Sequence, residues 1–398
     1  MQSFKNIEFQ KKEDNFIRII LYRNYYFDIK RNKLENIKII DKNTIDSDMN
    51  KKREYSHLMF LIERNLDKIR NLINEKPTTI IFPNTYPLIG HVAFGLIDRG
   101  TNLIEIKPNT GCNYRCIYCS ISEGDNSRPH DFFIDADYLV SEFKKLCKIK
   151  KNKVEAYIEP QGEPLLYPQI EYLIKELNKI KKVNRVILNT NGLLLNKKKI
   201  DGLKESGLDR INISVDSMSI NLEREITQTK VNIKNTLKMI KYSISKGINV
   251  MMTPVWMKGI NDDEIEKIIK FAKENNATLG IQNYLKYKYG RVPTEQIEFK
   301  TFYNKLEELE KKYDMRLILK PEHLDIYKDN QLERAFRRKE VVNVEILGKG
   351  RLRNETIGKS RNRLVIIPNS WNKLSGKEKA KVKIIKTKHN INIGIYEK

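Results

Sequence analysis

Short apolar runs alternate with amphipathic stretches along residues 99–293, and this alternation determines the expected fold. Six apolar runs of strand length follow one another, at 103–106, 154–158, 183–188, 210–215, 249–255 and 278–284. Stretches with apolar residues at helical spacing lie between them, such as 134–149, which Asp135 is suited to cap. Repeated strand–loop–helix units favour a parallel sheet. The pattern predicts an α/β fold, a partial (βα)6 TIM-like barrel with its chemistry at the carboxyl ends of the strands.

Residues 1–98 precede this pattern and carry no catalytic motif. Four apolar runs predict strands, at 16–26, 37–40, 79–82 and 91–97. Residues 55–73 have a helical stripe of apolar positions. We expect an N-terminal α+β extension, and both a substrate-binding or lid domain and a plain structural extension remain open.

The pattern changes again after residue 293. Residues 294–336 predict a closing helix at 299–313, a short strand at 317–319 and a linker. Residues 337–398 contain five short strand-like runs punctuated by Gly and Pro, at 341–347, 355–358, 364–367, 379–386 and 391–396. Five such strands in one small segment predict a C-terminal OB-like β-barrel.

Positive charge is concentrated in this last segment. The chain has a formal net charge of +24, and residues 337–398 hold 17 Lys and Arg against 5 Glu, a net of +12. This excess indicates a polyanionic partner, although AT-rich coding or a hot habitat would also enrich lysine. The composition, with 40% hydrophobic residues, is that of a folded protein.

Cysteine usage and hydropathy bear on location. Only four cysteines occur and three are clustered, which argues against a secreted disulfide framework and for a reducing compartment. No apolar run has the length of a bilayer span, and the N-terminus lacks a signal-peptide pattern. We therefore expect a cytoplasmic protein without a membrane partner.

The clustered cysteines lie directly after the first predicted strand. Residues 111–119 read Gly-Cys-Asn-Tyr-Arg-Cys-Ile-Tyr-Cys, so that Cys112, Cys116 and Cys119 form C-x3-C-x2-C. Three thiolates this close, with no fourth at matching spacing, can hold three corners of a [4Fe–4S] cube and leave one iron open. A structural zinc site is the alternative, and it would need a fourth ligand such as His130. Cys147 falls on an apolar helical face and is interpreted as a buried structural thiol.

This nonapeptide resembles the signature loop of the radical S-adenosylmethionine (radical SAM) enzymes. The resemblance covers roughly residues 100–290 and implies one [4Fe–4S] cluster on Cys112, Cys116 and Cys119. It also implies that S-adenosylmethionine (SAM) chelates the open iron and is reductively cleaved to a 5′-deoxyadenosyl radical. A reductant such as ferredoxin or flavodoxin would be a partner.

Further positions match the cofactor-binding elements of that family. Gly162-Glu163-Pro164 resembles the GGEP element, with Gln161 in place of its first glycine, and implies that Glu163 accepts hydrogen bonds from the SAM amino group. Polar residues ending the next two strands are implied to contact the SAM carboxylate and ribose, although turn formation would explain the same residue types. The expected cofactor-binding residues are Tyr118, Gly162, Glu163, Pro164, Thr190, Asn191, Ser214 and Asp216.

No other cysteines are available for additional chemistry. Methylthiotransferases of the superfamily carry three more cysteines near the N-terminus, and SPASM and twitch extensions also need extra ones. The dual-cysteine RNA methylases need a cysteine after the barrel, and none follows Cys147 here. The resemblance therefore implies a single-cluster enzyme.

The C-terminal segment resembles the TRAM domain, an RNA-binding barrel of several tRNA- and rRNA-modifying enzymes. The resemblance rests on the strand pattern, on Gly358-Lys359-Ser360 and on spaced basic residues. It implies phosphate contacts from Lys349, Arg351, Arg353, Lys359, Arg361 and Arg363. A merely solvated basic surface is the alternative.

Aromatic and basic residues also alternate after the sixth predicted strand. Tyr284, Tyr287, Tyr289 and Arg291 would either stack an extruded base or close the core, and we favour the core slightly.

Taken together, these features predict a radical SAM enzyme that modifies an RNA, with tRNA and rRNA as the expected substrates. Pairing the radical SAM motif with a TRAM-like tail resembles archaeal radical SAM proteins. Two alternatives remain: an enzyme that acts on a peptide or small molecule, and a non-catalytic iron–sulfur RNA-binding regulator. The regulator is disfavoured because it gives no reason for Glu163 and the polar residues at the strand ends.

Overall fold

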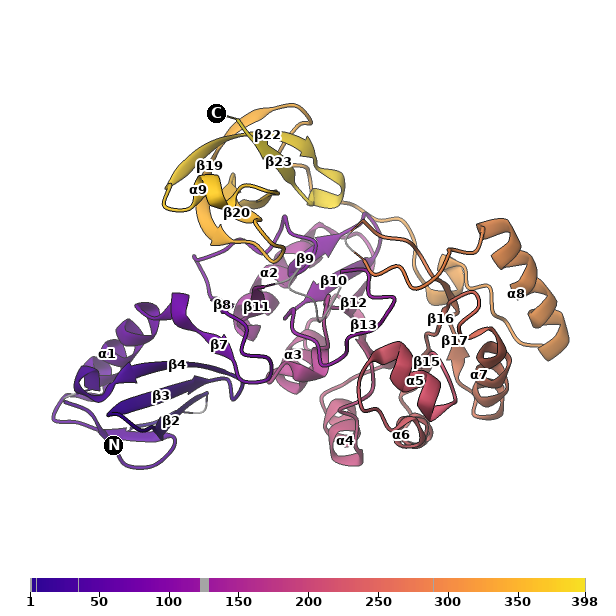
Figure 1. Cartoon of the computed structure of the whole chain (residues 1–398), viewed down its shortest axis with the longest axis horizontal. Helices are drawn as coiled ribbons and strands as arrows, with labels where there is room; N and C mark the ends of the chain where they lie inside the picture. The colour runs from indigo at the N-terminus through magenta and orange to yellow at the C-terminus, as the bar shows by residue number, and fades with distance from the viewer. Residues whose placement is uncertain (1, 5, 35, 122–128, 289, 398) are drawn as a thin grey trace. The chain divides into compact units, whose positions relative to one another are not determined.

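The structure of the protein, a computed structural model, describes residues 2–4, 6–34, 36–121, 129–288 and 290–397. It contains two compact units (Figure 1). One comprises Met1–Ile81 with Pro129–Phe133, and the other comprises Phe82–Arg128 with Ile134–Lys398. All residues expected to bind the cofactor or RNA belong to the second unit.

Among its described residues, the first unit is built from three small sheets and one α-helix. The four-stranded sheet has the order β2 (Ile7–Lys11), β3 (Phe16–Leu21), β4 (Tyr25–Lys30) and β7 (Arg70–Asn71). The three-stranded sheet consists of β1 (Gln2–Ser3), β6 (Thr44–Asp46) and β5 (Lys38–Ile39). The remaining elements are η1 (Arg31–Leu34), α1 (Lys51–Glu63), η2 (Leu66–Lys68) and the pair β8 (Thr78–Ile81) with β11 (Asp131–Ile134).

Two predicted elements of this unit are shorter than their apolar pattern indicated. The predicted strand 16–26 is interrupted at Tyr22 and Arg23, whose φ angles of 50° and 64° form the turn between β3 and β4. The predicted helix 55–73 ends early, because the side-chain amide of Asn65 donates to the Leu61 carbonyl at 2.8 Å. That carbonyl is the acceptor that the main chain of Asn65 would use in a longer helix.

The core of the second unit is one seven-stranded sheet. Its order is β17 (Thr278–Leu279), β15 (Asn249–Met252), β14 (Arg210–Ile213), β13 (Val183–Thr190), β12 (Val154–Ile158), β10 (Leu103–Lys107) and β9 (Gly95–Asp98). The first six strands of this list pair in parallel, and β9 pairs with β10 antiparallel. The prediction of six successive parallel strands in an open sheet is confirmed. Although β9 precedes the expected boundary at residue 98, its pairing makes it part of this sheet.

Seven helices accompany the sheet because each has one apolar stripe to bury. They are α2 (Ala136–Ile149), α3 (Ile170–Asn178), α4 (Lys197–Glu205), α5 (Ile220–Thr227), α6 (Ile233–Ser245), α7 (Asp262–Glu274) and α8 (Phe299–Tyr313). The Asp135 side chain caps α2 by accepting from the Tyr138 N–H at 3.1 Å, as predicted. Short 3-10 turns are η3 (Pro164–Leu166) and η4 (Pro321–Leu324). The short strand predicted at 317–319 is absent.

The last two strands of the parallel series are each divided. The chain bends after β15 and again after β17, and the continuations β16 (Val255–Trp256) and β18 (Gln282–Asn283) pair with each other in a separate ladder. The two long strands predicted at 249–255 and 278–284 are therefore wrong in length. Gly280 and Pro254 lie at these interruptions, where a regular strand ladder is weakened.

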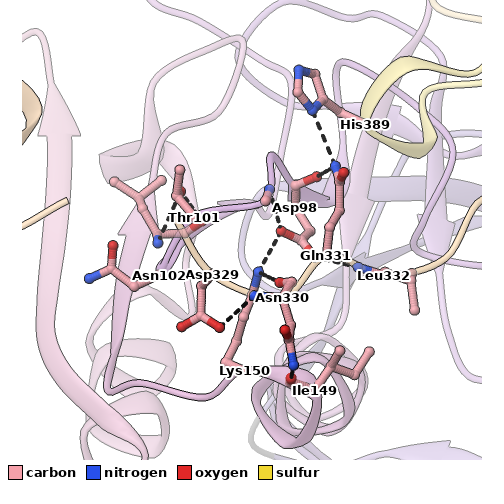
Figure 2. A network of polar contacts seen from close by, with 12 residues as sticks. Asp98, Thr101, Asn102, Ile149, Lys150, Asp329, Asn330, Gln331, Leu332 and His389 are labelled. Carbon is pink, nitrogen blue, oxygen red and sulfur yellow. Dashed lines mark hydrogen bonds and ion pairs between the residues drawn. The ribbon is translucent and has the colours of Figure 1, made fainter. Parts of the chain in front are cut away.

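A buried ion pair ties the segment after α8 to the edge of the sheet (Figure 2). Lys150 Nζ, at the end of α2, lies 2.6 Å from Asp98 Oδ1 and also donates to the Asn330 carbonyl at 2.6 Å. The second Asp98 oxygen accepts from the Leu332 N–H at 2.9 Å. Gln331 lies between the Asp98 carbonyl and His389 of the C-terminal barrel. The segment predicted as a linker is thus fixed to the sheet rather than extended in solvent.

The C-terminal residues form a closed five-stranded barrel. Its order is β19 (Val341–Lys349), β20 (Thr356–Ser360), β21 (Arg363–Ile367), β23 (Ile393–Tyr396) and β22 (Lys379–Lys386), with α9 (Trp371–Leu374) and η5 (Lys388–Asn390) in its connections. The five predicted strands are confirmed. The interior is so narrow that a Cβ on Gly358 would lie 2.3 Å from Val344 Cγ1. Main-chain bonds join the barrel to the segment before β9, as from the Leu364 N–H to the Ile89 carbonyl at 2.8 Å.

Within the described ranges, no helix combines the length and the apolar character needed to cross a membrane.

Candidate functional site

The cysteine loop, residues 111–119, follows β10 and is held by the main chain of its neighbours. The N–H groups of Arg115 and Ile117 donate to carbonyls in the last turn of α5, at 3.0 and 2.9 Å. On the other side, the Arg291 N–H donates to the Cys119 carbonyl at 3.1 Å. These bonds fix the backbone of the loop on both sides of Cys116.

The three thiols of the loop are unbridged, partly buried and close enough to influence one another. Burial, and after it the neighbouring Cys112, raises the pKa of Cys116 well above its usual range, and Cys119 adds to the effect. Thiolate sulfur is the donor that an iron–sulfur cluster takes from a protein, so cluster binding would displace these protons. The donor set therefore fits the three protein corners of a [4Fe–4S] cluster.

The zinc alternative is not supported by the arrangement of ligands. In the part of the chain that the structure describes, no three His, Cys, Asp or Glu side chains are placed to hold one metal ion. A cluster does not require that convergence, because its thiolates bind different iron atoms. A ring nitrogen of His130 lies 2.7 Å from Thr79 Oγ1 in the first unit, and Cys147 is buried in α2 with its pKa raised by burial to about 12. The buried position predicted for Cys147 is confirmed.

Gly162 brings the loop after β12 into direct contact with the cysteine loop. A Cβ at this position would lie 2.4 Å from the Gly111 carbonyl oxygen and 2.7 Å from the Thr110 carbonyl carbon. The N–H of the next residue, Glu163, donates to the same Gly111 carbonyl at 2.8 Å. Glycine is thus required for the approach of two backbones. Pro164, buried at the start of η3, continues the same loop.

The Glu163 carboxylate is held by hydrogen bonds within the protein, and the direct ligand role expected for it stays a prediction. The residue is 1% exposed. One oxygen accepts from Thr190 Oγ1 at 2.6 Å and from the Leu165 N–H at 2.9 Å, while the other accepts from the Asn191 N–H at 2.8 Å. Glu163 therefore joins the carboxyl ends of β12 and β13 and positions their backbone.

The residues expected at the ends of β13 and β14 differ in their availability. Thr190 is buried against Glu163. Asn191 reaches the cysteine loop, where its Nδ2 donates to Asn113 Oδ1 at 2.7 Å. Ser214 is partly exposed, and no described residue bonds to its hydroxyl. Of the polar residues at these two strand ends, Ser214 thus has a side chain available to a ligand.

Asp216 and Tyr118 are joined by a hydrogen bond. Asp216 Oδ2 accepts from the Tyr118 hydroxyl at 2.7 Å, and Oδ1 accepts from the Val255 N–H at 2.8 Å. Burial raises the pKa of Asp216 to about 6. The Tyr118 ring packs with Ile226 and Met257 in an apolar cluster. The two side chains anchor the last turn of the cysteine loop, and the ligand contacts expected of them stay predictions.

Arg351 was expected on an RNA-binding surface, and this expectation is wrong. Its side chain leaves the barrel and is only 2% exposed. Nη2 donates to the carbonyls of Thr110 and Gln161, both at 2.6 Å, and Nη1 donates to Gln161 Oε1 at 2.9 Å. The guanidinium thus clamps the residues next to the cysteine loop and next to Gly162. The unusual Gln161 was the only sequence signal for this clamp.

The other expected RNA-binding residues differ in their exposure and partners. Arg361 pairs with Glu340 at 2.5 Å, and Lys359 pairs with Glu345 at 3.1 Å. Arg363 is half-buried, and burial lowers its pKa. Lys349 is exposed, with its ammonium 5.6 Å from the Trp371 ring centroid, and Arg353 is exposed. Of these five residues, Lys349, Arg353 and Arg361 are exposed.

A cavity of about 710 Å³ opens beside the cysteine loop. Cys112, Cys119 and Gly162 lie on its wall. Charged side chains line much of the remainder: Arg99, Lys107, Lys288, Lys386, Glu105 and Glu159. Glu105 offsets part of this charge, because it pairs with Arg99 and lies 3.2 Å from Lys107 Nζ. Lys386 comes from the barrel, so the cavity joins the cysteine loop to the basic C-terminal segment.

The aromatic and basic residues after β18 have separate roles. Tyr284 is buried in the apolar cluster with Met257, so the core interpretation is confirmed for it. Tyr287, 49% exposed, lines the cavity instead. Arg291 donates to the Arg115 carbonyl at 2.8 Å and supports the cysteine loop. Tyr289 lies outside the described residues.

The pH dependence of folding should report the buried Glu163. Burial raises its pKa from the ordinary 4.5 to about 7 in the folded chain. Because the folded state holds this proton more tightly, the contribution of Glu163 to the unfolding free energy is greatest below pH 4.5 and is lost as the pH rises to about 7. Glu163→Gln has no such titration. The unfolding free energy of the variant relative to wild type should rise by up to about 3 kcal/mol across this range.

Urea denaturation at both ends of the pH range checks this expectation, with Glu205→Gln as the matched control. Glu205 is an exposed residue of α4, and its substitution should give a difference that does not vary with pH. A difference for Glu163→Gln that is equally constant would contradict the raised pKa.

Comparison with known proteins identifies a family and relatives that the chain resembles. A family model described as the radical SAM superfamily matches residues 106–272, which include the three cysteines of the loop and Gly162. The chain is 35% identical over 347 residues to uncharacterized protein MJ0103 of Methanocaldococcus jannaschii, covering 79% of this chain and 80% of that protein.

Other matches have named activities or solved structures. The chain is 36% identical over 186 residues to the GTP 3′,8-cyclase of Helicobacter pylori, covering 45% of this chain and 54% of the cyclase. Among solved structures, SuiB of Streptococcus suis has a TM-score of 0.45 at 16% identity, covering 80% of this chain and 71% of that one. Given the cysteine loop, the open parallel sheet, the family model and the M. jannaschii relative, the chain belongs to the radical SAM superfamily.

Proposed function

We propose that this protein is a radical SAM enzyme that modifies an RNA, with tRNA and rRNA as the substrate pools to examine first. One observation carries the proposal: the cavity bordered by Cys112 and Cys119 also includes Lys386 of the basic barrel. A cationic segment of net charge +12 that reaches the reactive cavity favours a polyanionic substrate over a neutral one.

The chain's own residues would divide the work as follows. Cys112, Cys116 and Cys119 would hold one [4Fe–4S] cluster, and the backbone beside Gly162 together with the Ser214 hydroxyl would bind SAM. When bound, these two groups supply a 5′-deoxyadenosyl radical. Glu163 would keep the loops after β12 and β13 in register. Lys107, whose Nζ donates to the Glu159 carbonyl at 2.7 Å, would hold the cavity wall in place.

A free purine nucleotide is the second candidate substrate. It is favoured by the similarity to proteins named GTP 3′,8-cyclase, which covers 45% of this chain in the H. pylori example. The cations lining the cavity would suit a triphosphate as well as a nucleic-acid backbone. The two candidates differ in whether the basic barrel contacts the substrate.

Formation of 5′-deoxyadenosine tests the proposal. The reconstituted protein would be reduced anaerobically with SAM, in parallel with bulk tRNA, with rRNA, with GTP and without substrate, using RNA from a host that lacks the gene. Stimulation by one RNA pool supports the proposal and identifies the pool. Stimulation by GTP alone would overturn it in favour of the nucleotide, and equal formation in every sample would point to a peptide or another metabolite. No formation from protein with an intact cluster would favour a non-catalytic regulator.

A further inference from the structure

A second cavity, of about 660 Å³, lies on the outer face of the barrel. We call it the barrel groove, and its lining includes Lys288, Lys373, Ile385, Lys386, Ile395 and Tyr396. Lys288 and Lys386 line both this groove and the cavity beside Cys119. The two cavities therefore border each other at these lysines, one beside the cysteine loop and one on the barrel.

An irregularity in β22 places Lys386 at this border. Up to Ile384 the strand alternates, with lysines outward and apolar residues in the barrel core. The register with β23 then shifts between Ile384 and Lys386, so that Ile385 and Lys386 are both exposed in succession. A β-bulge re-aims side chains in this way next to functional sites. Here it presents an apolar and a cationic side chain together at the junction of the two cavities.

The lining of the barrel groove matches the chemistry of a single-stranded nucleic acid. Ile385 is 40% and Ile395 54% exposed, an unusual exposure for large apolar side chains in one patch. Tyr396 adds an aromatic ring, and the nearby Lys377 Nζ donates to its hydroxyl at 2.9 Å. Three lysines and no acidic residue line the groove among the described side chains. Apolar and aromatic surfaces take bases, while interspersed lysines take phosphates.

We propose that the barrel groove binds the single-stranded nucleotides that flank the target nucleotide of an RNA substrate, and that Lys386 holds the phosphate at the junction with the reactive cavity. This inference rests on the proposed function and refines it. It places the RNA contact on the face of β22 and β23. The basic residues expected to make that contact lie from β19 to β21.

Binding of a short fluorescein-labelled oligouridine to the full chain, followed by anisotropy over a range of salt concentrations, tests the proposal without requiring turnover. Lys386→Glu should weaken binding by about 10-fold or more and lower the slope of log affinity against log salt by about 0.7. Ile395→Ser should weaken binding with little change in that slope, because it removes a contact to a base. Lys381→Glu is the matched control: it carries the same charge change on an exposed position of β22 that does not line the groove.

The outcomes separate this inference from the proposed function. If Lys386→Glu and Lys381→Glu weaken oligouridine binding equally, the proposal for the barrel groove is overturned, since the barrel would then act only through its overall charge. Displacement of the oligouridine by polyglutamate at equal charge concentration would overturn it in favour of an acidic protein partner. If tRNA or rRNA stimulates 5′-deoxyadenosine formation equally in wild type and Lys386→Glu, the proposed role of the barrel groove is wrong. The proposal that RNA is the substrate is then retained. Unchanged thermal unfolding of each variant establishes that the barrel is folded.

Discussion

Cys116→Ala should leave a folded chain that no longer assembles its cluster or forms 5′-deoxyadenosine. The substitution removes one of three thiolates from a loop whose backbone is fixed on both sides by α5 and by Arg291, so no other ligand can take its place. Iron content after anaerobic reconstitution should fall from about four per chain to near zero. Formation of 5′-deoxyadenosine should fall by more than about 100-fold, the upper cost of losing only a supporting residue around a metal.

Cys147→Ala is the control that the chain itself offers. This thiol is buried in α2 and its pKa is raised to about 12 by burial, so it has a packing role only. The variant should retain full iron content and activity at a cost of about 1 kcal/mol in unfolding free energy. Retention of iron by Cys116→Ala, or one zinc per chain in the wild type, would contradict the assignment of the loop.

Arg351→Met should disconnect the barrel from the cysteine loop. The methionine keeps an apolar stem of similar length but leaves the carbonyls of Thr110 and Gln161 buried without their donor. We expect the unfolding free energy to fall by about 3 kcal/mol. We also expect 5′-deoxyadenosine formation to fall by about 10-fold or more, because a small displacement of a positioned loop has effects of this size or larger.

The readout that distinguishes positioning from stability is spectroscopic. In the wild type, addition of SAM should change the electron paramagnetic resonance spectrum of the reduced cluster. Arg351→Met should bind iron but lose much of that change. Arg351→Lys should recover it only in part, because an ammonium cannot reproduce the fork of a guanidinium. Arg353→Met, an exposed position two residues away, should behave as wild type. A full SAM response in Arg351→Met would show that the clamp is dispensable.

The features that could be predicted from the sequence are those that depend on local patterns. Strand periodicity predicted the six parallel strands and the five strands of the barrel. The pattern of apolar and polar residues within each strand reflects which of its side chains are buried. The spacing of Cys112, Cys116 and Cys119 likewise lies within one loop. Asn65 ends the helix α1, but the helical spacing of apolar residues continues beyond it. The predicted helix was therefore longer than the observed one.

The features that could not be predicted depend on partners distant in the chain. Glu163 matched its motif, but its hydrogen bonds to Thr190 and Asn191, which turn the carboxylate inward, appear only when β12 and β13 are paired. Arg351 looked like any other arginine of a basic segment, and its acceptor carbonyls lie about 190 and 240 positions earlier. The register shift after Ile384 leaves no signal in composition, yet it exposes Lys386 beside the reactive cavity.

The clamp at Arg351 also has a consequence for the order in which the protein is made. Synthesis proceeds from the N-terminus, and domains fold as they emerge from the ribosome. The cysteine loop and its sheet are complete well before residue 351 is added, so for that interval the loop lacks one of its restraints. Chains that terminate early would contain all three cysteines without the clamp. A residue translated long after the loop thus decides when the nascent chain acquires the final shape of its cysteine loop.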